Sequence, residues 1–464
     1  MVRAGAARRP DPPTPGSDTR PRGPQWLGID LVAQRWLFPA AGLVATALGG
    51  SIYAFSVFIT PLEAEFGWSR SQTVLAFAVA LVCLALAVFG GGALVDRFGP
   101  RWTLGGGGTL AGAGMAASGA ADHVGELVVT FGVMVGTGIG LVYSATTIAL
   151  AARWFPDARW RGTAIGWSVV GFGLGATVAA PLWTVGIETV GWRSTYVITG
   201  VVFIVVYLAL TTLVRFPPPD WTFDGDRGWQ HLSGHDRAQL GRQAQNAPDP
   251  ADLTLREALD SRALWLLSIT FFLAIIGGLT TISELAPFIE SAEPTGLGAT
   301  PGTAAALIVV FSLHNGLGRP LSGWASARAG LRHATLGCYL LMAAGMLVLA
   351  AATAWAPLVL PGVMITGLAF GSILALNPTM TVALFGASFV ARIFGVVYVI
   401  GIGAGGLLGP PLGGAVLDAT GSYVPVFIAG AVASMLAAGG AVALPDGERQ
   451  HSTRTRALVT GGPS

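Results

Sequence analysis

An arginine inside a long apolar segment is the residue of this chain best suited to bind an anion. Arg319 follows Asn315 by one helical turn in the segment that runs from Leu307 to Gly323. A planar guanidinium can hold both oxygens of a carboxylate at once. If the segment reaches the cytoplasm near Ala327, Arg319 lies about 12 Å deep at 1.5 Å per residue. An unpaired arginine at that depth costs at least about 2.5–3.5 kcal/mol, so we expect a site for an anionic substrate there.

The same arginine has a structural interpretation. Its long side chain can extend toward the inner interface, or its guanidinium can pair permanently with a backbone carbonyl. His314, beside Asn315, could titrate near neutral pH or could be a hydrogen-bonded packing residue. Glu284 is the only acid well inside the apolar segments of the second half. It could carry a coupled proton, pair with Arg319, or lie at the outer surface.

Other polar or aromatic side chains in apolar segments are candidates to line a substrate cavity with Arg319 and Asn315. They are Tyr53, Tyr143, Trp167, Asn377 and Tyr398. Aromatic residues in membrane spans more often pack or anchor at the interface. None of these residues would identify a binding site alone.

The composition requires a membrane. The chain has 464 residues, of which 53% are hydrophobic and 11% charged, whereas a soluble domain averages about 25% charged. The excess apolar surface must face lipid. A net charge of +2 gives no reason to expect a nucleic-acid partner. All 26 basic residues are arginine, and Cys83 and Cys338 both fall in apolar runs, which favours buried, unreactive thiols.

No arrangement of residues indicates an enzyme. We find no nucleophile–base set, metal-ligand cluster or nucleotide loop, and we expect no cofactor. The glycine-rich runs at 105–108 and 171–175 follow no strand, and the chain has no lysine for a Walker site. These runs therefore predict close helix packing.

The chain contains twelve apolar segments, most of them long enough to cross a bilayer of about 30 Å. A polar linker, 216–261, divides them into an N-terminal bundle, 36–215, and a C-terminal bundle, 262–444. Residues 1–35 predict a disordered tail, and 445–464 a second tail. The expected spans are 36–60, 73–96, 102–121, 126–151, 163–186, 194–215, 262–288, 303–326, 333–353, 357–383, 392–416 and 423–444.

Arginine in short loops predicts the orientation. With both termini in the cytoplasm, only Arg70 and Arg193 lie in outer loops. The positive-inside rule therefore favours an inner-membrane protein with both termini cytoplasmic. The inner loops carry Arg97, Arg101, Arg153, Arg159, Arg161, Arg328, Arg332 and Arg392.

The two halves repeat at a fixed offset of 231 residues. Gly67 corresponds to Gly298, Arg97 to Arg328, and Gly99 to Gly330. Parallel repeats of six spans predict two bundles related by an axis along the membrane normal, with a site between them. We expect an all-α membrane protein of twelve transmembrane helices in two pseudo-symmetric six-helix bundles.

The loop after the second segment carries a motif. It reads Gly92-x-x-x-Asp96-Arg97-x-Gly99-x-Arg101, and it resembles the signature loop of the major facilitator superfamily. Gly92 would allow close helix contact, and Asp96 can pair with an arginine or cap a helix. The second copy reads Gly323-x-x-x-Ala327-Arg328-x-Gly330-x-Arg332 and lacks the acid. The resemblance implies that both are gating loops.

Further segments resemble the monocarboxylate transporters and the oxalate/formate exchangers of that superfamily. They are Ser51–Ser69, Arg153–Gly175 and Gly409–Tyr423. Monocarboxylate transporters carry an acid four residues before a substrate-linked arginine, and here that pair is Asn315 and Arg319. Oxalate exchangers carry a lysine shortly after a tyrosine in the eleventh span. The corresponding position here is Gly401, so Arg319 would be the one fixed cation of the site. One cation favours a substrate with one carboxylate over oxalate, which has two.

The resemblance and the residues together predict a secondary active transporter. It would move a small monocarboxylate by alternating access, as proton symport or anion exchange, and would work as a monomer. Efflux of a hydrophobic drug or metabolite is the nearest alternative, although no acid lies clearly inside the first six spans. A non-transporting sensor or scaffold is a third, but the linker and tails are small for a signalling domain.

Overall fold

A computed structural model describes residues 25–26, 29–30, 35–147, 150, 153–155, 158–217, 252–386 and 388–445. The chain forms two units, Met1–Leu37 and Phe38–Ser464. In the first unit, strands β1 (Gln25–Trp26) and β2 (Ile29–Asp30) pair antiparallel. Most of the predicted tails and linker lies outside the described residues.

The first half of the chain is helical from its first span to its sixth. A 3₁₀ segment interrupts the first span, and a π-helical segment lies in the fourth. The elements are α1 (Leu37–Gly50), η1 (Ser51–Phe58), α2 (Ile59–Phe66), α3 (Arg70–Ser118), α4 (Val124–Leu127), η2 (Val128–Val135), α5 (Gly136–Thr146) and α7 (Ala158–Leu213).

The second half begins with the short helix α9 (Leu255–Leu259), which Thr254 caps through its side chain. A π-helical segment lies within the eleventh span. The remaining elements are α10 (Arg262–Glu290), α11 (Pro301–Ala329), α12 (Leu331–Ala352), η4 (Ala356–Leu358), α13 (Val359–Phe385), α14 (Val390–Tyr398), η5 (Val399–Ala404), α15 (Gly405–Thr420) and α16 (Tyr423–Val442).

Twelve membrane crossings follow from these helices. Among the described residues, ten helices are long and apolar enough to cross a membrane. Two of them, α3 with 49 residues and α7 with 56, are each about twice the length that one crossing needs. Each is broken by a glycine at positive φ, Gly99 at 82° and Gly191 at 83°, a conformation that glycine adopts without steric cost. The predicted all-α fold of twelve spans is confirmed.

The backbone repeats the offset seen in the sequence. Gly67 and Gly298 have φ of 67° and 61°, and Gly99 and Gly330 have φ of 82° and 84°. The same turns therefore occur 231 residues apart, which supports the predicted pseudo-symmetry of the halves. We call the ends of the helices near these pairs the Gly67 end and the Gly99 end.

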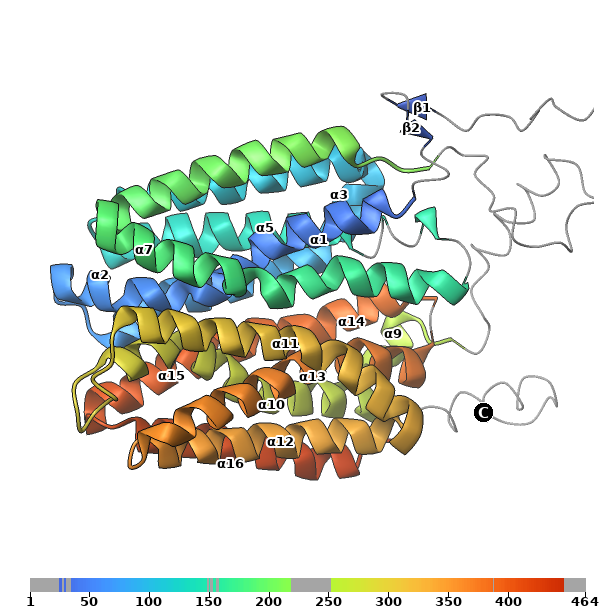
Figure 1. Ribbon diagram of the computed structural model, residues 1–464. Helices are drawn as coiled ribbons and strands as arrows, with labels where there is room; N and C mark the ends of the chain where they lie inside the picture. The colour runs from blue at the N-terminus through green and yellow to red at the C-terminus, as the bar shows by residue number, and fades with distance from the viewer. Residues whose placement is uncertain are drawn as a thin grey trace, which may run out of the picture. The chain divides into compact units, whose positions relative to one another are not determined.

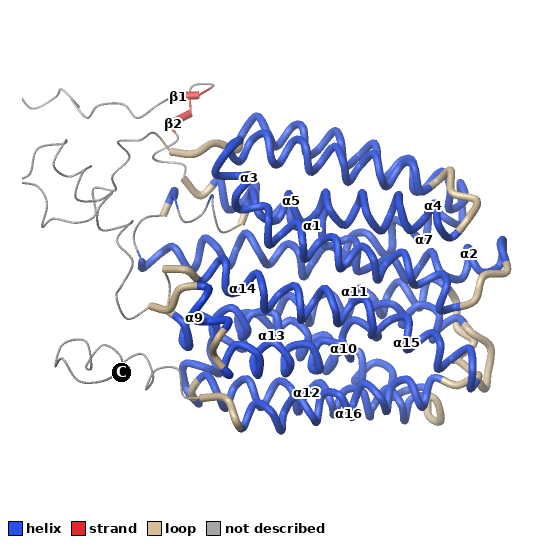
Figure 2. The backbone as a smooth tube through the Cα atoms, turned by 180° about the vertical axis from the view of Figure 1, so that it is seen from behind, coloured by secondary structure: helices blue, strands red, loops and turns tan. Residues whose placement is uncertain are grey.

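Within Phe38–Ser464 the helices of each half lie together (Figure 1), and Figure 2 shows the same grouping from behind. The halves meet where α3 packs against α14 and α15, and where α7 packs against α11. The glycine-rich run 171–175 packs closely, as predicted. A Cβ at Gly171 or Gly175 would overlap the carbonyl oxygen of Leu43 or Ala47 in α1.

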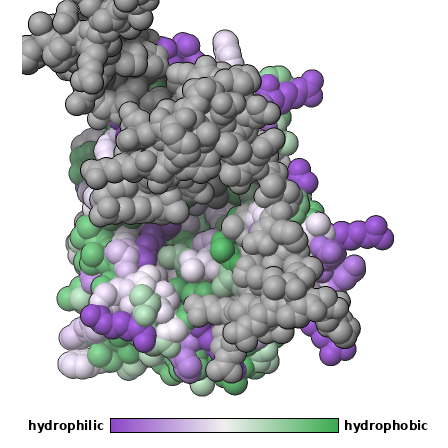
Figure 3. Space-filling model, turned by 90° about the vertical axis from the view of Figure 1, so that its right-hand side faces the viewer, coloured by the Kyte–Doolittle hydropathy of each residue, from purple (hydrophilic) through white to green (hydrophobic). Residues whose placement is uncertain are grey.

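The Gly99 end carries the arginines of the two motif loops. Arg97, Arg101, Arg328 and Arg332 are all exposed. Figure 3 views this end and shows hydrophilic side chains among hydrophobic ones on the part of the surface that is in sight. The positive-inside rule predicts that the end carrying these arginines faces the cytoplasm.

Candidate functional site

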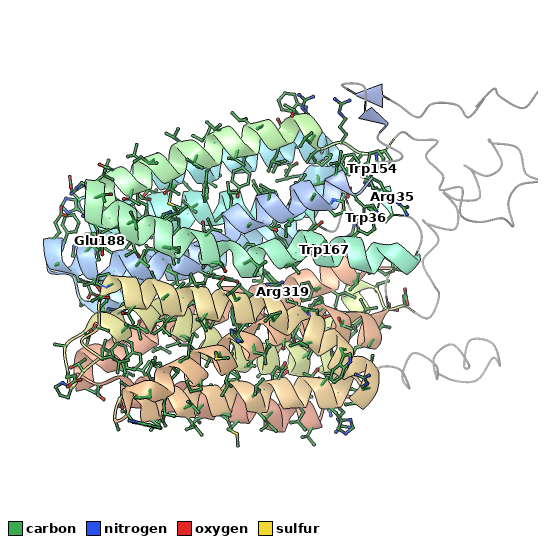
Figure 4. The ribbon with its side chains drawn as sticks, viewed as in Figure 1. Arg35, Trp36, Trp154, Trp167, Glu188 and Arg319 are labelled. Atoms are coloured by element: carbon green, nitrogen blue, oxygen red, sulfur yellow. The ribbon has the colours of Figure 1, made fainter. Side chains whose placement is uncertain are left out.

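Arg319 lies about midway along the helices, where α11 faces α7 (Figure 4). Helix α11 begins at Pro301, and the Thr300 side chain accepts a hydrogen bond from the Thr303 amide, a favourable start for a helix. The Nε atom of Arg319 is buried and donates to no acceptor. Among the residues that the structure describes, no carboxylate pairs with this guanidinium.

A glycine of α7 makes room for the arginine. A Cβ added to Gly173 would lie 3.2 Å from Arg319 Nε. Beside it, the Ser312 hydroxyl donates to the Gly173 carbonyl oxygen at 2.7 Å, which joins α11 to α7. The fifth and eighth spans are thus in direct contact at Arg319.

Three tyrosines lie near enough to Arg319 to interact with it electrostatically. The hydroxyl groups of Tyr53, Tyr143 and Tyr398 all interact electrostatically with the Arg319 guanidinium. They come from η1, α5 and the end of α14, so both halves contribute. We call these three residues the tyrosine cluster. Phenolic hydroxyls donate and accept hydrogen bonds, so the cluster and Arg319 together can bind an anion with a polar group.

Phenylalanines pack against two members of the tyrosine cluster. Tyr53 packs edge-on against Phe172 and Phe370, with ring centroids 5.3 and 5.6 Å apart. Tyr143 packs edge-on against Phe172 as well, at 5.7 Å. The rings of Tyr53 and Tyr143 therefore stand among apolar side chains, a setting in which polar contacts are strong.

Asn315 lies one helical turn before Arg319. Its side chain is fully buried, and neither Oδ1 nor Nδ2 has a hydrogen-bond partner. A buried amide without hydrogen-bond partners lowers the stability of the fold. We therefore expect a ligand or a water molecule to form the missing hydrogen bonds. His314 differs, because its Nδ1 lies 2.8 Å from the Val310 carbonyl oxygen of the same helix. This geometry favours the packing interpretation of His314.

Three predicted residues lie elsewhere. Asn377 is buried within the second half, where its Nδ2 donates to the Ile373 carbonyl oxygen and its side chain lies beside Tyr339. Glu284 is fully buried and pairs with Arg70 at 2.9 Å. The expectation that Glu284 lies at the outer surface or pairs with Arg319 is therefore wrong. Trp167, on α7, is 55% exposed.

The partners of Glu284 form a polar network at the Gly67 end. Arg70, the first residue of α3, donates to both Glu63 carboxylate oxygens, at 2.6 and 2.8 Å, and to the Tyr423 hydroxyl at 2.7 Å. Asp418 accepts from the Arg70 and Ser71 amides, both at 3.2 Å. Sequence reasoning treated Arg70 only as an outer-loop arginine. Nothing in its spacing indicates partners on α10, α15 and α16.

The first motif loop makes an ion pair at the Gly99 end. Asp96 accepts from Arg153 at 2.9 Å, and both side chains are largely exposed. The predicted arginine partner is thus present, and it belongs to the same half. A Cβ at Gly92 or at Gly323 would meet no atom within 4 Å. The expected close helix contact at Gly92 is therefore wrong.

The remaining arginines of the motif loops contact nearby groups. Arg97 lies over the Phe98 ring and Arg328 over the Trp324 ring, at 5.2 and 4.1 Å from the centroids. Arg332 donates to the Val442 carbonyl oxygen. Arg101 is exposed. These contacts anchor the loops within their own halves.

Comparisons with curated proteins identify relatives along most of the chain. It is 28% identical over 301 residues to the oxalate:formate antiporter of Oxalobacter formigenes, a match that spans 65% of each protein. The chain thus matches slightly less than two thirds of the antiporter's length. It is also 25% identical over 407 residues to monocarboxylate transporter 12 of Mus musculus, which covers 85% of this chain and 82% of that protein.

The fold and the family model agree. A crystal structure of a bacterial homologue of the human lysosomal transporter Spinster matches with a TM-score of 0.59 and 19% identity. The match covers 93% of this chain and 98% of the other, and it shows the shared fold. The model of the Major Facilitator Superfamily matches residues 40–296 and 285–459. The chain therefore belongs to the Major Facilitator Superfamily and is a multi-pass membrane transporter.

Proposed function

We propose that this transporter moves a small monocarboxylate across the cell membrane by alternating access, as proton symport or anion exchange. The observation that carries the proposal is Arg319, which lies midway along α11 with a buried Nε that has no acceptor. A cation in that position needs a counter-charge. The carboxylate of a substrate can supply it when no protein carboxylate does.

Each neighbour of Arg319 has a role in this proposal. The guanidinium binds the carboxylate through two hydrogen bonds. The hydroxyls of the tyrosine cluster and the free amide of Asn315 contact the remaining polar atoms of the substrate. The names of the relatives, an oxalate:formate antiporter and a monocarboxylate transporter, support a small carboxylate as the substrate class.

The position of Gly401 favours one carboxylate over two. A Cβ added there would overlap the Phe271 ring. The eleventh span therefore has neither a second cation at this position nor the space for one. A dicarboxylate would leave one charge without a partner in an apolar site, which is costly. A monocarboxylate fits the single guanidinium better.

The transport cycle follows from the two halves. The arginine bias favours a cytoplasmic location for the Gly99 end, both termini and the linker. The motif loops, with Asp96 and Arg153, gate that end. Glu284 and His314 remain the candidates for a coupled proton, and one monomer contains a complete site between its halves. Alternating opening of the two ends then carries the substrate across.

Uptake into right-side-out vesicles tests the proposal. The probes are radiolabelled formate, acetate, lactate, pyruvate and oxalate, each measured with and without an imposed pH gradient. We expect at least one monocarboxylate to accumulate in a manner that Arg319→Ala abolishes, and oxalate to compete weakly. Vesicles without the protein correct for diffusion of the neutral acids. If none of the carboxylates enters or competes, while hydrophobic cations are expelled, the proposal is wrong and efflux is the function.

A further inference from the structure

The two halves are joined at the Gly67 end by a buried ion pair. Arg70 belongs to the first half and Glu284 to the second, and their side chains are 8% and 0% exposed. Arg70 also bonds to Glu63 in its own half and to the Tyr423 hydroxyl in the other. One guanidinium therefore holds groups from α2, α10 and α16 together.

Neighbouring contacts close the same end. Asp418 of α15 accepts from the Ser71 hydroxyl at 2.9 Å, so the first turn of α3 is fixed to the second half. A Cβ at Gly414 would lie 2.9 Å from the Ser71 amide nitrogen, which shows how closely the two helices approach. The Gly67 end is therefore closed by polar contacts between the halves.

The Gly99 end is built differently. Among the described residues, the exposed pair Asp96–Arg153 at this end stays within the first half. Where the halves touch near this end, a Cβ on Gly395 would overlap the apolar ring of Phe89. Apolar contacts can separate without leaving an unpaired charge in apolar surroundings. Separating a buried ion pair leaves such a charge.

Parting the halves at the Gly67 end has unequal effects on the two ions. Arg70 keeps Glu63, its partner within the first half. Glu284 keeps only Ser283 and Tyr423 of its own half and loses Arg70. Among the described residues, Arg70 is the one cation that faces it. We propose that Arg70 and Glu284 are an ion-pair lock that holds the Gly67 end closed, and that a proton on Glu284 releases it.

The direction of the pH effect follows from linkage. In the closed state the Arg70 guanidinium stabilises the charged form of Glu284, and this contribution is lost when the halves part. Protonation removes the charge that binds Arg70, so acid at the Gly67 end shifts the population toward opening. The other ionisable groups around the pair are Glu63, Glu290, Asp418 and Tyr423. The lock rests on the alternating access proposed above and is independent of the monocarboxylate.

A single cysteine behind the lock reports the opening. Ala78 is fully buried and lies on the same face of α3 as Ser71 and Leu81. Ser71 and Leu81 lie against Gly414 and Gly406 of the second half. The parent variant is Cys83→Ser, Cys338→Ser, Ala78→Cys, reconstituted in nanodiscs and treated with a maleimide without any substrate. Labelling at about pH 7.5 and about pH 5.5 spans the range in which a buried carboxyl group can titrate. Gly125→Cys, at an exposed position of the short helix α4 at the same end, corrects for the reagent's own pH dependence.

Glu284→Gln imitates the protonated carboxyl group. We expect it to raise the labelling rate of Ala78→Cys at neutral pH at least about tenfold, as for the loss of a charged hydrogen bond. Acid should raise labelling in the parent and change little in Glu284→Gln. Glu65→Gln is the matched control, because Glu65 is a carboxylate at the same end that pairs with Arg193 within the first half. It should behave as the parent does.

Three results would overturn the lock. In the first, Glu284→Gln is labelled no faster than the parent. In the second, Glu65→Gln is labelled as fast as Glu284→Gln. In the third, acid raises labelling equally in the parent and in Glu284→Gln. If Glu284→Gln does not fold, Tyr423→Phe removes one contact to Arg70 without changing charge. It should raise labelling and keep the acid response, and unchanged labelling would refute the lock. Because no substrate is present, failure of the monocarboxylate proposal leaves these outcomes unaffected.

Discussion

Replacing Arg319 by alanine tests the substrate site most directly. The substitution removes two charge-assisted hydrogen bonds to a bound carboxylate, and each contributes about 1.5–3 kcal/mol. The loss of one such bond already weakens binding by about tenfold to a hundredfold. The structure indicates little cost in stability. Arg319 pairs with no carboxylate among the described residues, and its Nε already lacks an acceptor, so the substitution breaks no ion pair there.

The assay compares a carboxylate with its uncharged analogue. Binding of the transported acid and of its amide is measured on purified protein by isothermal titration calorimetry. Arg319→Ala should weaken the acid strongly and the amide little, which separates a substrate role from a structural one. Arg319→Lys should restore the charge but not the two-pronged geometry, so its affinity should stay low.

A matched control comes from the same helix. Arg328→Ala removes an exposed arginine of α11 that lies over the Trp324 ring at the Gly99 end. It should leave the affinity for the acid unchanged. Normal binding of the acid by Arg319→Ala would refute the role of this arginine. So would an equal loss in Arg328→Ala, or an Arg319→Ala protein that no longer runs as a single folded species on size-exclusion chromatography.

Three further predictions concern topology, the gating loop and helix packing. Single cysteines at Gly225 and at the exposed Ala292 should react with an impermeant maleimide from opposite faces of the membrane; reaction of both from outside intact cells would disprove the orientation. Asp96→Asn should slow exchange and leave equilibrium affinity intact, with a stability change of at most about 1 kcal/mol because the pair with Arg153 is exposed; lost binding with normal exchange would contradict a gating role. Gly175→Ala should lower the thermal midpoint, since overpacking costs about 1–3 kcal/mol, whereas Gly166→Ala, with no atom within 4 Å of the added Cβ, should not; equal midpoints would contradict the close packing of α7 on α1.

The length and spacing of apolar segments determined the fold class. A bilayer of fixed thickness sets the length of each crossing, so the number of spans can be counted along the chain. The offset of 231 residues identified the repeat, and the structure reproduces it in the φ angles of Gly67 and Gly298. The motif loop around Asp96 pointed to the family. These properties are local or periodic, and a sequence carries them directly.

Arg319 was also identifiable from the sequence, because a charge deep in an apolar span is costly wherever the helix points. Its surroundings were not. Tyr53, Tyr143 and Tyr398 lie within electrostatic range of it, whereas Asn377, also a polar residue inside a span, lies beside Tyr339 within the second half. The direction in which a side chain leaves its helix decides between these outcomes.

The ion pair at the Gly67 end is the clearest feature that only the tertiary structure decided. Glu284 and Arg70 are 214 residues apart and lie on helices of different halves. From the sequence alone, Arg70 suggested an outer-loop position, and Glu284 could carry a coupled proton, pair with Arg319 or lie at the outer surface. Whether two such residues meet depends on the rotation, tilt and register of their helices. Those quantities come from the packing of many small side chains over the whole interface, and no spacing along the chain records them.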